Sequence, residues 1–386
     1  MTTHPSFEID LHGSPIRVAA GALHDCGTMC RRVAPAHLYA LITDANVAPA
    51  WLAPAREALE RDGGGARVIT RTIAAGEATK TRETWAALTD WLLANGAGRD
   101  TTVVALGGGV VGDLAGFVAA TFLRGVPVVQ IPTTLLAMVD AAIGGKTGVD
   151  TPNGKNLVGA FHPPAAVLID PQVLATLPSR ELRAGLAEVL KHGAIADESY
   201  FERAAAWGRR LREQQRDEPY EWGSAEAAEL IARSAEIKAD VVRVDLREGG
   251  RRQVLNAGHT TAHALEKVTS YAIPHGEAVA IGLVFEARLA ERCGIAATGT
   301  AATLEQALAG AGLPVELPAG ADPAALASAM RSDKKNRSGQ VRFTLLSRVG
   351  AVAGDEARGW SVALDDTLVR DALDAASRPA QPPVAR

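Results

Sequence analysis

Three histidines stand close together in the segment from Arg251 to Glu277. His259 and His263 are four residues apart, and His275 follows twelve residues later. Side chains four residues apart share one face of a helix, and neutral imidazole is the commonest transition-metal ligand. A helical histidine pair with a third group from elsewhere is the usual geometry of an open catalytic site. The spacing therefore favours a divalent metal over histidines that only pack or cap.

The same segment argues against one well-known use of a metal. Thr260 stands where the H-E-x-x-H motif of metalloproteases carries its general base, so this pattern does not indicate metal-assisted peptide hydrolysis. Arg252 and Asn256 lie about one helical turn apart, and both could reach the same cavity.

A second concentration of polar residues lies between the two halves of the chain. The stretch IGGKTGVDTPNGKN, residues 143–156, is a long glycine-rich connection with two lysines, and such connections are usually binding loops. Glu188 and Lys191 share a helical face and form either a surface ion pair of little consequence or part of a site. This many cations near a metal suit a multiply anionic small substrate. The polar residues between the halves are Asp140, Lys146, Lys155, Asn156, Glu188 and Lys191, and further cations near the histidine segment are Lys238, Arg252, Lys334 and Lys335.

A nucleotide signal comes from Gly107, Gly109 and Gly112, which satisfy G-x-G-x-x-G between a strand-like run and a helix. Glycines there let backbone N–H groups approach a pyrophosphate. The acidic residue expected about 20 positions later is missing, and either Asp44 or Glu77 could replace it. A glycine-rich turn without any ligand remains the alternative.

The chain changes character near Pro178. Before it, short β-rich runs alternate with helical ones, which predicts a mostly parallel sheet with helices on both faces. After it, apolar residues recur at three- and four-residue steps in nearly every segment, as in helices. We therefore expect an α/β domain over residues 1–177, a helical domain over 178–376 and a disordered tail over 377–386.

Composition limits the function classes. The chain has 386 residues, 47% of them hydrophobic, and a formal net charge of −4, with no basic block that would recommend nucleic acid or an anionic membrane. Apolar runs stop short of the roughly 18 residues that span a bilayer, and no export signal is visible. Cys26, Cys30 and Cys293 are too few for a disulfide framework, so a reducing cytoplasm is the expected location.

Six blocks in order resemble the 3-dehydroquinate synthase family and its sugar-phosphate cyclase relatives, over roughly residues 15–375. The resemblance implies a doubly wound NAD-binding domain followed by a helical metal-binding domain. It also implies a zinc- or cobalt-dependent enzyme that converts 3-deoxy-D-arabino-heptulosonate 7-phosphate to 3-dehydroquinate and phosphate. The steps implied are transient oxidation by NAD, phosphate elimination, re-reduction and an intramolecular aldol reaction. The blocks are GGGVVGDLAGFVAATFLRG, QIPTTLLAMVDAAIGGKTGVDTPNGKN, LPSRELRAGLAEVLKHG, IKADVV, LNAGHTTAHALE and HGEAVAIG.

The resemblance also implies roles for individual residues. It assigns the metal to Glu188, His259 and His275, and leaves His263 as an acid/base group, which replaces the geometric expectation that both histidines of the pair are ligands. Arg124 resembles an arginine that reaches the substrate of a neighbouring subunit, which implies a homodimer. Implied substrate and catalytic residues are Asp140, Lys146, Asn156, Lys191, Lys238, Arg252, Asn256 and Lys334 or Lys335. Implied NAD contacts are Asp44, Glu77, Lys80, Gly108, Gly109, Asp113, Thr133, Thr134, Lys146 and Lys155.

Local departures leave the subclass open. Ala141 and Ala142 stand where serines are frequent, and Ala257 and Ala262 replace a frequent aromatic residue and a frequent glycine. An amino-dehydroquinate synthase, a 2-epi-5-epi-valiolone synthase or, less favoured, a metal-dependent alcohol dehydrogenase are the alternatives. The cations and amide that would meet a substrate carboxylate are present and favour the heptulosonate; they are Arg252, Asn256, Lys334 and Lys335.

Overall fold

The computed structural model describes residues 5–214, 220–332 and 340–377. The chain forms two compact units, one of residues 1–185 with 219–246 and one of residues 186–218 with 247–386. The division differs from the predicted boundary after residue 177 in that residues 219–246 group with the first unit. The two-domain division at residue 177 stays a prediction, and each compact unit is described by itself below.

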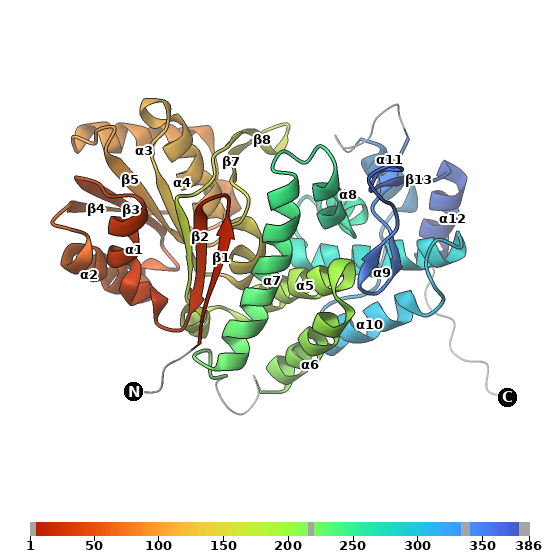
Figure 1. The fold of residues 1–386 in the computed structure, drawn as a ribbon. Coiled ribbons are helices and arrows are strands. Elements are labelled where there is room, and N and C mark those ends of the chain that lie inside the picture. The colour runs from red at the N-terminus through yellow and green to blue at the C-terminus, as the bar shows by residue number, and fades with distance from the viewer. Residues whose placement is uncertain (1–4, 215–219, 333–339, 378–386) are drawn as a thin grey trace. The chain divides into compact units, whose positions relative to one another are not determined.

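The first unit is built on a seven-stranded sheet in the order β1-β2-β9-β6-β5-β3-β4 (Figure 1). Strands from β2 to β4 run parallel, and only β1 is antiparallel to its neighbour. The predicted mostly parallel sheet is therefore confirmed, with an additional N-terminal hairpin. The strands are β1 (Ser6–Leu11), β2 (Ser14–Ala19), β3 (Leu38–Asp44), β4 (Arg67–Ile73), β5 (Thr101–Gly107), β6 (Val128–Pro132) and β9 (Ala166–Ile169).

The helices of this unit alternate with the strands, as in a doubly wound fold. Every residue of β5 is buried, and Val103 and Ala105 share one apolar core with Val111 and Leu114 of α4 (Gly109–Thr121). Thr81 begins α3 by accepting a hydrogen bond from the Thr84 N–H at 3.2 Å. The helices are α1 (Cys26–Val33), α2 (Ala53–Asp62), α3 (Arg82–Ala94), α4 (Gly109–Thr121) and α7 (Ala225–Val244).

The glycine-rich connection expected at residues 143–156 is instead mostly a β-hairpin of β7 (Lys146–Thr151) and β8 (Gly154–Phe161). Gly148 and Gly159 are paired across the two strands. A Cβ on Gly159 would lie 2.1 Å from the Thr147 carbonyl oxygen. The prediction of a loop was wrong because these glycines permit close approach of two strands, and do not mark irregular backbone.

A short helical segment precedes this hairpin. It ends with a π-helical turn, Ala137–Ala141, that contains Asp140. Gly144 and Gly145 follow with φ angles of 102° and 66°. These angles lie outside the right-handed helical region, so the chain leaves the helix here and enters β7.

The second unit is mostly helical, as the sequence predicts. Its only strands among the described residues form two short antiparallel pairs, β10 (Arg342–Phe343) with β13 (Val362–Ala363) and β11 (Leu346–Arg348) with β12 (Ala351–Val352). The fold class predicted from the sequence, an α/β part followed by a helical part, is confirmed. The helices are α5 (Ser179–Ala196), which begins in the first unit, α6 (Glu198–Gln214), α8 (His259–Val268), α9 (His275–Arg292), α10 (Thr300–Gly310), α11 (Pro323–Arg331) and α12 (Asp366–Ala376).

Helices α8 and α9 pack against each other at unusually short range. A Cβ on Gly282 of α9 would lie 2.0 Å from the Gly258 carbonyl oxygen at the start of α8. Glu286, one turn further along α9, accepts hydrogen bonds from the backbone N–H groups of Gly258 and Thr261, both at 2.9 Å. A carboxylate is favourable at a helix N-terminus because the N–H groups there carry partial positive charge. The start of α8 is thus held by α9.

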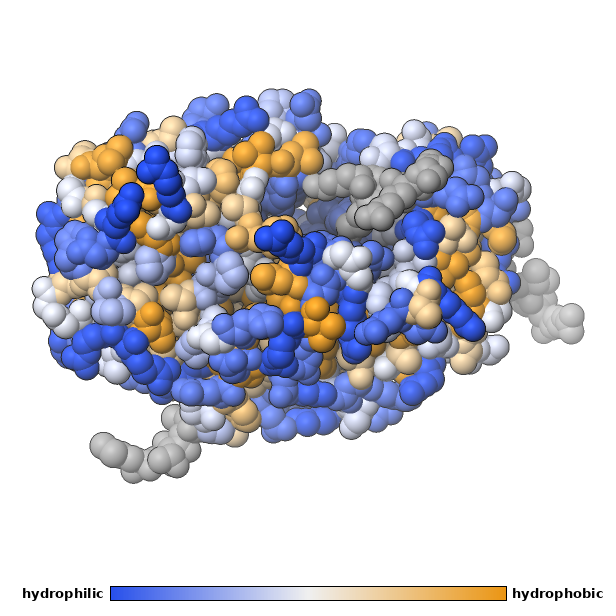
Figure 2. Space-filling model, turned by 45° about the horizontal axis from the view of Figure 1, so that its top comes forward, coloured by the Kyte–Doolittle hydropathy of each residue, from blue (hydrophilic) through white to orange (hydrophobic). Residues whose placement is uncertain are grey.

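No helix of the described residues is long and apolar enough to cross a membrane. Figure 2 shows one face on which apolar residues form several separate patches among hydrophilic ones. All three cysteines are free, and Cys26 and Cys30 are buried. The predicted disordered tail lies outside the described residues except for Ser377.

We predict that Gly282→Ala lowers the free energy of unfolding by about 1–3 kcal/mol, because the added methyl group forces α9 away from α8. The measurement is chemical denaturation monitored by circular dichroism. Gly249→Ala is the matched control, since a Cβ there meets nothing within 4 Å. Equal stability of the two variants would contradict the close packing described here.

Candidate metal and nucleotide sites

Glu188, His259 and His275 come together in the second unit. One ligand atom from each lies within 4.8 Å of the other two. The Nε2 atoms of His259 and His275 lie 3.7 and 3.5 Å from Glu188 Oε1, and the Glu188 side chain is completely buried. Two imidazoles and a carboxylate are a donor set that suits a catalytic divalent cation.

The local fold explains how two of these groups are presented. His259 and His275 are the first residues of α8 and α9, and Gly258 precedes the first of them with a φ of 79°. His259 Nδ1 lies 3.1 Å from the Ala257 carbonyl oxygen, so that nitrogen donates and Nε2 is left facing Glu188. Fixing the tautomer in this way is typical of metal-binding histidines.

The electrostatics of the trio favour a positive charge. Burial lowers the pKa of His275, but hydrogen bonds to Glu188 and Glu266 outweigh it and raise the pKa to about 10. The negative groups around this ring therefore stabilise a cation, whether a proton or a metal ion. This is the property expected of a site that holds a divalent metal.

Lys191 is also part of this cluster. Its ammonium group pairs with Glu188 Oε2, one helical turn away on α5. Lys191 is 1% exposed and Glu188 is 0% exposed, so the alternative of a surface ion pair was wrong. Removing both charges from water is costly, and such a pair is weak evidence for a stabilising role. A functional role is the better explanation of its burial.

His263 lies beside the trio but is not one of its members. Its ring centroid is 5.5 Å from that of His259, and the two rings meet edge to face. His259 thus groups with Glu188 and His275, and not with its i+4 neighbour. The acid/base role implied for His263 is compatible with this position, and stays a prediction.

Two other candidates of this unit lie in or near the 3-10 helix η7 (Arg251–Asn256). Arg252 is 2% exposed, which is unusual for an arginine. Asn256 donates from Nδ2 to Glu248 Oε1 at 2.9 Å. Lys334 and Lys335 lie outside the described residues.

In the first unit, Lys238 of α7 reaches Asp140. Its Nζ lies 2.5 Å from both the carbonyl oxygen and Oδ1 of Asp140. Lys238 is 5% exposed, so the pair is largely removed from water. Two candidates that are 98 residues apart are therefore brought together by the fold.

A second buried cation in this unit is surrounded by carboxylates. Lys80 Nζ lies 2.8, 3.3 and 3.6 Å from Glu77, Asp113 and Asp150, and Lys155 lies 3.9 Å from Glu77. Burial raises the pKa of Asp113 to about 6, although Lys80 opposes the shift. Burial lowers the pKa of Lys80, but Asp113 and Glu77 outweigh it and raise it. The cluster has more acids than bases, which explains why one carboxyl retains its proton most easily.

Asp150 is a residue that the sequence reasoning missed. Its Oδ1 accepts from the Asn156 N–H at 2.8 Å, and its own N–H donates to the Lys80 carbonyl oxygen at 2.8 Å. Asn156 has a φ of 53°, a conformation that needs such support in a residue other than glycine. Asp150 thus links Lys80 with Asn156. Its place in the turn VDTPNGKN offers no sequence signal beyond a typical turn residue.

The glycine turn joins β5 to α4, as predicted. Gly108 is the N-cap of α4 and has no side chain to cap the first turn. A Cβ on Gly108 would lie 2.9 Å from Thr134 Cγ2, and one on Gly112 would lie 2.9 Å from Gln130 Oε1. Gly112 therefore serves the packing of α4 on the sheet, while the start of α4 keeps backbone N–H groups available to an anion.

The remaining candidates of the first unit lie at strand ends and turns. The Thr133 N–H donates to the Gly107 carbonyl oxygen at 3.0 Å. Asp44, at the end of β3, accepts from the Asn46 and Val47 N–H groups at 2.8 and 3.1 Å. Arg124 is exposed and has a φ of 72°, as part of a strained turn after α4.

Comparisons with known proteins agree with this arrangement. Residues 70–184 match the family described as 3-dehydroquinate synthase N-terminal, and residues 185–336 match 3-dehydroquinate synthase C-terminal. The chain is 47% identical to a 3-dehydroquinate synthase of Xanthomonas axonopodis pv. citri (strain 306), over 89% of this chain and 93% of the relative. It is 46% identical to one of Xylella fastidiosa (strain M23), over 87% and 90%.

Solved structures of two other cyclases are also similar. A 2-deoxy-scyllo-inosose synthase with carbaglucose-6-phosphate, NAD+ and Co2+ has a TM-score of 0.79 at 25% identity, over 96% of this chain and 100% of that one. A 2-epi-5-epi-valiolone synthase of Streptomyces hygroscopicus subsp. jinggangensis 5008, with NAD+ and Zn2+, has a TM-score of 0.81 at 26% identity, over 98% and 99%. A probable glycerol dehydrogenase of Sinorhizobium meliloti 1021, at 18% identity and a TM-score of 0.59, shares the fold alone, over 93% and 95%.

We predict that Glu188→Ala, His259→Ala and His275→Ala each lose bound metal, because three protein ligands leave none to spare. Metal content after dialysis, measured by mass spectrometry, provides the test. His263→Ala is the matched control and should retain its metal. Full metal stoichiometry in His259→Ala would exclude the assignment.

We also predict a pH effect from the Lys80 cluster in the NAD-free protein. The folded pKa of Asp113, about 6, lies above the roughly 3.9 of an unfolded aspartate. The folded state therefore binds this proton more tightly, and the Asp113 contribution to stability falls as pH rises from about 4 to about 6. Relative to Asp113→Asn, the wild-type protein should be less stable at pH 7.5 than at pH 5. The free energy of unfolding of both proteins is measured by denaturation at pH 5 and pH 7.5. The same difference between wild type and Asp113→Asn at both pH values would contradict the prediction.

Proposed function

The chain belongs to the 3-dehydroquinate synthase family, and we propose that it converts 3-deoxy-D-arabino-heptulosonate 7-phosphate to 3-dehydroquinate and phosphate, in the shikimate route. Curated relatives with that name cover most of the chain at 46–47% identity. The observation that carries the proposal is the cluster of Glu188, His259 and His275, whose ligand atoms lie within 4.8 Å of one another; a metal-dependent cyclase needs such a cluster, and a family match alone does not test it.

NAD and one divalent ion, zinc or cobalt, are the cofactors of this proposal. The donor atoms of Glu188, His259 and His275 suit the ion. The N-terminus of α4, which no side chain caps, suits a pyrophosphate. When bound, NAD supplies a reversible hydride acceptor and the ion supplies a Lewis acid for the hydroxyl being oxidised. We assign NAD to Asp44, Glu77, Lys80, Gly108, Gly109, Asp113, Thr133, Thr134, Lys146 and Lys155.

The chain's own residues orient the substrate and move its protons. Buried cations hold the two anionic ends, and this positioning is what an intramolecular reaction chiefly requires. His263 is the acid/base group beside the trio. Its ring packs edge to face against the ring of His259, a proposed metal ligand. Lys191 pairs with Glu188, a proposed metal ligand, and would keep a positive charge beside the site when the ion is bound. We assign the substrate to Asp140, Lys146, Asn156, Lys191, Lys238, Arg252, Asn256 and Lys334 or Lys335.

The proposed assembly rests on the family pattern, and the proposed location rests on the cysteines. Arg124 acts on the substrate of a second copy of the chain, so the active form is a homodimer. Its exposure on the first unit leaves it available for such a contact. The enzyme works in the cytoplasm, in keeping with three free cysteines.

Another sugar-phosphate cyclase is the second candidate, because the two solved cyclases cover nearly the whole chain. The lower identity of those structures, 25–26% against 47% for the named synthase, favours the heptulosonate. A metal-dependent alcohol dehydrogenase is less favoured, since the glycerol dehydrogenase shares the fold alone. That activity would accumulate NADH, whereas a cyclase returns the hydride within each turnover.

The proposal is tested by incubating the protein with the heptulosonate, NAD and zinc or cobalt, and following phosphate release and product by mass spectrometry. Sedoheptulose 7-phosphate is the comparison substrate, since it keeps the phosphate and lacks the carboxylate. We expect turnover of the first without net NADH. Efficient cyclisation of the second, with no turnover of the first, would move the chain to the valiolone-type cyclases.

We further predict that Arg252→Ala loses about 100-fold or more in kcat/KM toward the heptulosonate, because a charge-assisted hydrogen bond contributes about 1.5–3 kcal/mol and arginine can make two. NAD affinity, measured by calorimetry, should stay near the wild-type value. Arg251→Ala is the control, since that guanidinium lies over the Trp360 ring at 5.6 Å and is exposed. Equal kinetics of the two variants would remove Arg252 from the substrate-binding set.

A further inference from the structure

The two ring nitrogens of His275 face two different carboxylates. Nε2 lies 3.5 Å from Glu188 Oε1, and Nδ1 lies 3.3 Å from Glu266 Oε1. An ionised carboxylate only accepts hydrogen bonds, so the contact with Glu266 places the proton on Nδ1. When a cation replaces the second ring proton, the lone pair of Nε2 would be directed to the same side as Glu188, where the third ligand His259 also lies.

The position of Glu266 is fixed by the helix that also carries His259. The two residues are seven positions apart on α8, which is two helical turns, and so lie on one face. Glu266 is 6% exposed. A carboxylate this buried needs a partner, because an unpaired buried charge is costly. His275 provides one such partner, from the first turn of the next helix.

The turn between the two helices brings these residues together. Ser270 and Tyr271 adopt φ angles of 51° and 62°, and the Tyr271 N–H donates to the Glu266 carbonyl oxygen at 2.7 Å. Two successive residues in the left-handed region reverse the chain directly after α8. The first turn of α9 is thereby returned to the face of α8 that carries Glu266.

We propose that Glu266 is a positioning residue of the metal centre, which fixes the tautomer and ring orientation of His275 by accepting its Nδ1–H. The corresponding acceptor for His259 is a backbone carbonyl, that of Ala257, which no side-chain change can remove. Of these two acceptors, only the Glu266 carboxylate belongs to a side chain, so it is the one that a substitution can change. The inference rests on the proposed metal site of Glu188, His259 and His275, and acts through His275 without contact with the ion.

Three substitutions of Glu266 separate positioning from charge and packing. Glu266→Gln keeps the length and an acceptor oxygen, Glu266→Asp keeps the charge but withdraws the oxygen by one methylene group, and Glu266→Ala removes the acceptor. We expect zinc affinity, measured by competition with a chromophoric chelator, to fall about 10- to 100-fold in the Asp and Ala variants. The Gln variant should bind zinc at least as tightly as the Asp variant.

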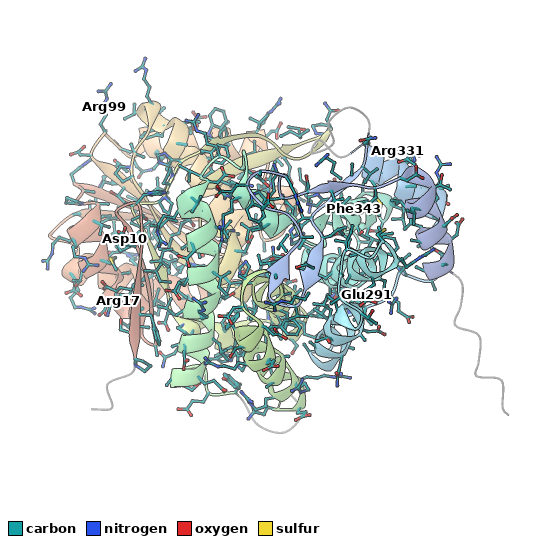
Figure 3. The ribbon with its side chains drawn as sticks, turned by 45° about the vertical axis from the view of Figure 1, so that its right-hand side comes forward. Asp10, Arg17, Arg99, Glu291, Arg331 and Phe343 are labelled. Atoms are coloured by element: carbon teal, nitrogen blue, oxygen red, sulfur yellow. The ribbon has the colours of Figure 1, made fainter. Side chains whose placement is uncertain are left out.

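Visible absorption of the cobalt-loaded proteins provides a second readout, because a rotated His275 ring changes the ligand field of the ion. We expect altered spectra for the Asp and Ala variants and a spectrum nearest the wild type for Gln. Glu291→Gln is the matched control, a glutamate near the far end of α9 that accepts from the Ala301 N–H at 2.8 Å (Figure 3). Its zinc affinity and cobalt spectrum should equal those of the wild type.

Zinc affinity of the Asp or Ala variant within about threefold of wild type would overturn the proposal, as would tighter binding by Asp than by Gln. If Ala does not fold, the comparison of Asp with Gln decides by itself. Wild-type protein that binds no zinc, or Glu188→Ala that binds it fully, would instead overturn the metal site of the proposed function. The two failures are therefore distinguishable.

Discussion

The contact between the start of α8 and the body of α9 is the constraint on which the candidate metal site depends. Gly282 allows α9 to approach the Gly258 carbonyl oxygen where any Cβ would collide, and Glu286 holds the first N–H groups of α8. Because His259 and His275 are the first residues of these helices, this single packing contact determines how far apart the two imidazoles lie.

Buried charge is the second theme, and it recurs in both units. Lys80 and Lys238 in the first unit and Lys191 in the second are each 5% exposed or less, and each contacts at least one carboxylate. Such pairs cost desolvation energy that their mutual attraction repays poorly. A protein that needs only stability would replace them by apolar residues. A synthase whose substrate has two anionic groups, and which uses NAD and a metal, has a use for charges already withdrawn from water.

Several features of the fold could be predicted from the sequence, and the misses have physical causes. Alternating strand and helix patterns predicted the parallel sheet because periodicity is a local property. The hairpin of β7 and β8 was missed since Gly148 and Gly159 break the strand pattern, and only their partner strand shows that they are paired. Glu266 and Asp150 carried no signal, because a carboxylate in a helix or turn is usually solvated.

The sequence by itself determined the family, the fold class and the residue types available for metal, nucleotide and anion, since these follow from motifs, spacing and composition. Only the tertiary structure decided which groups meet. Spacing along one helix paired His259 with His263, and the family resemblance implied Glu188, His259 and His275. The fold groups the latter three, with Glu188 from α5 and His275 from α9. The reason is that a ligand cluster is defined by distances between side chains of different helices, and those distances are set by packing contacts such as that of Gly282 with Gly258.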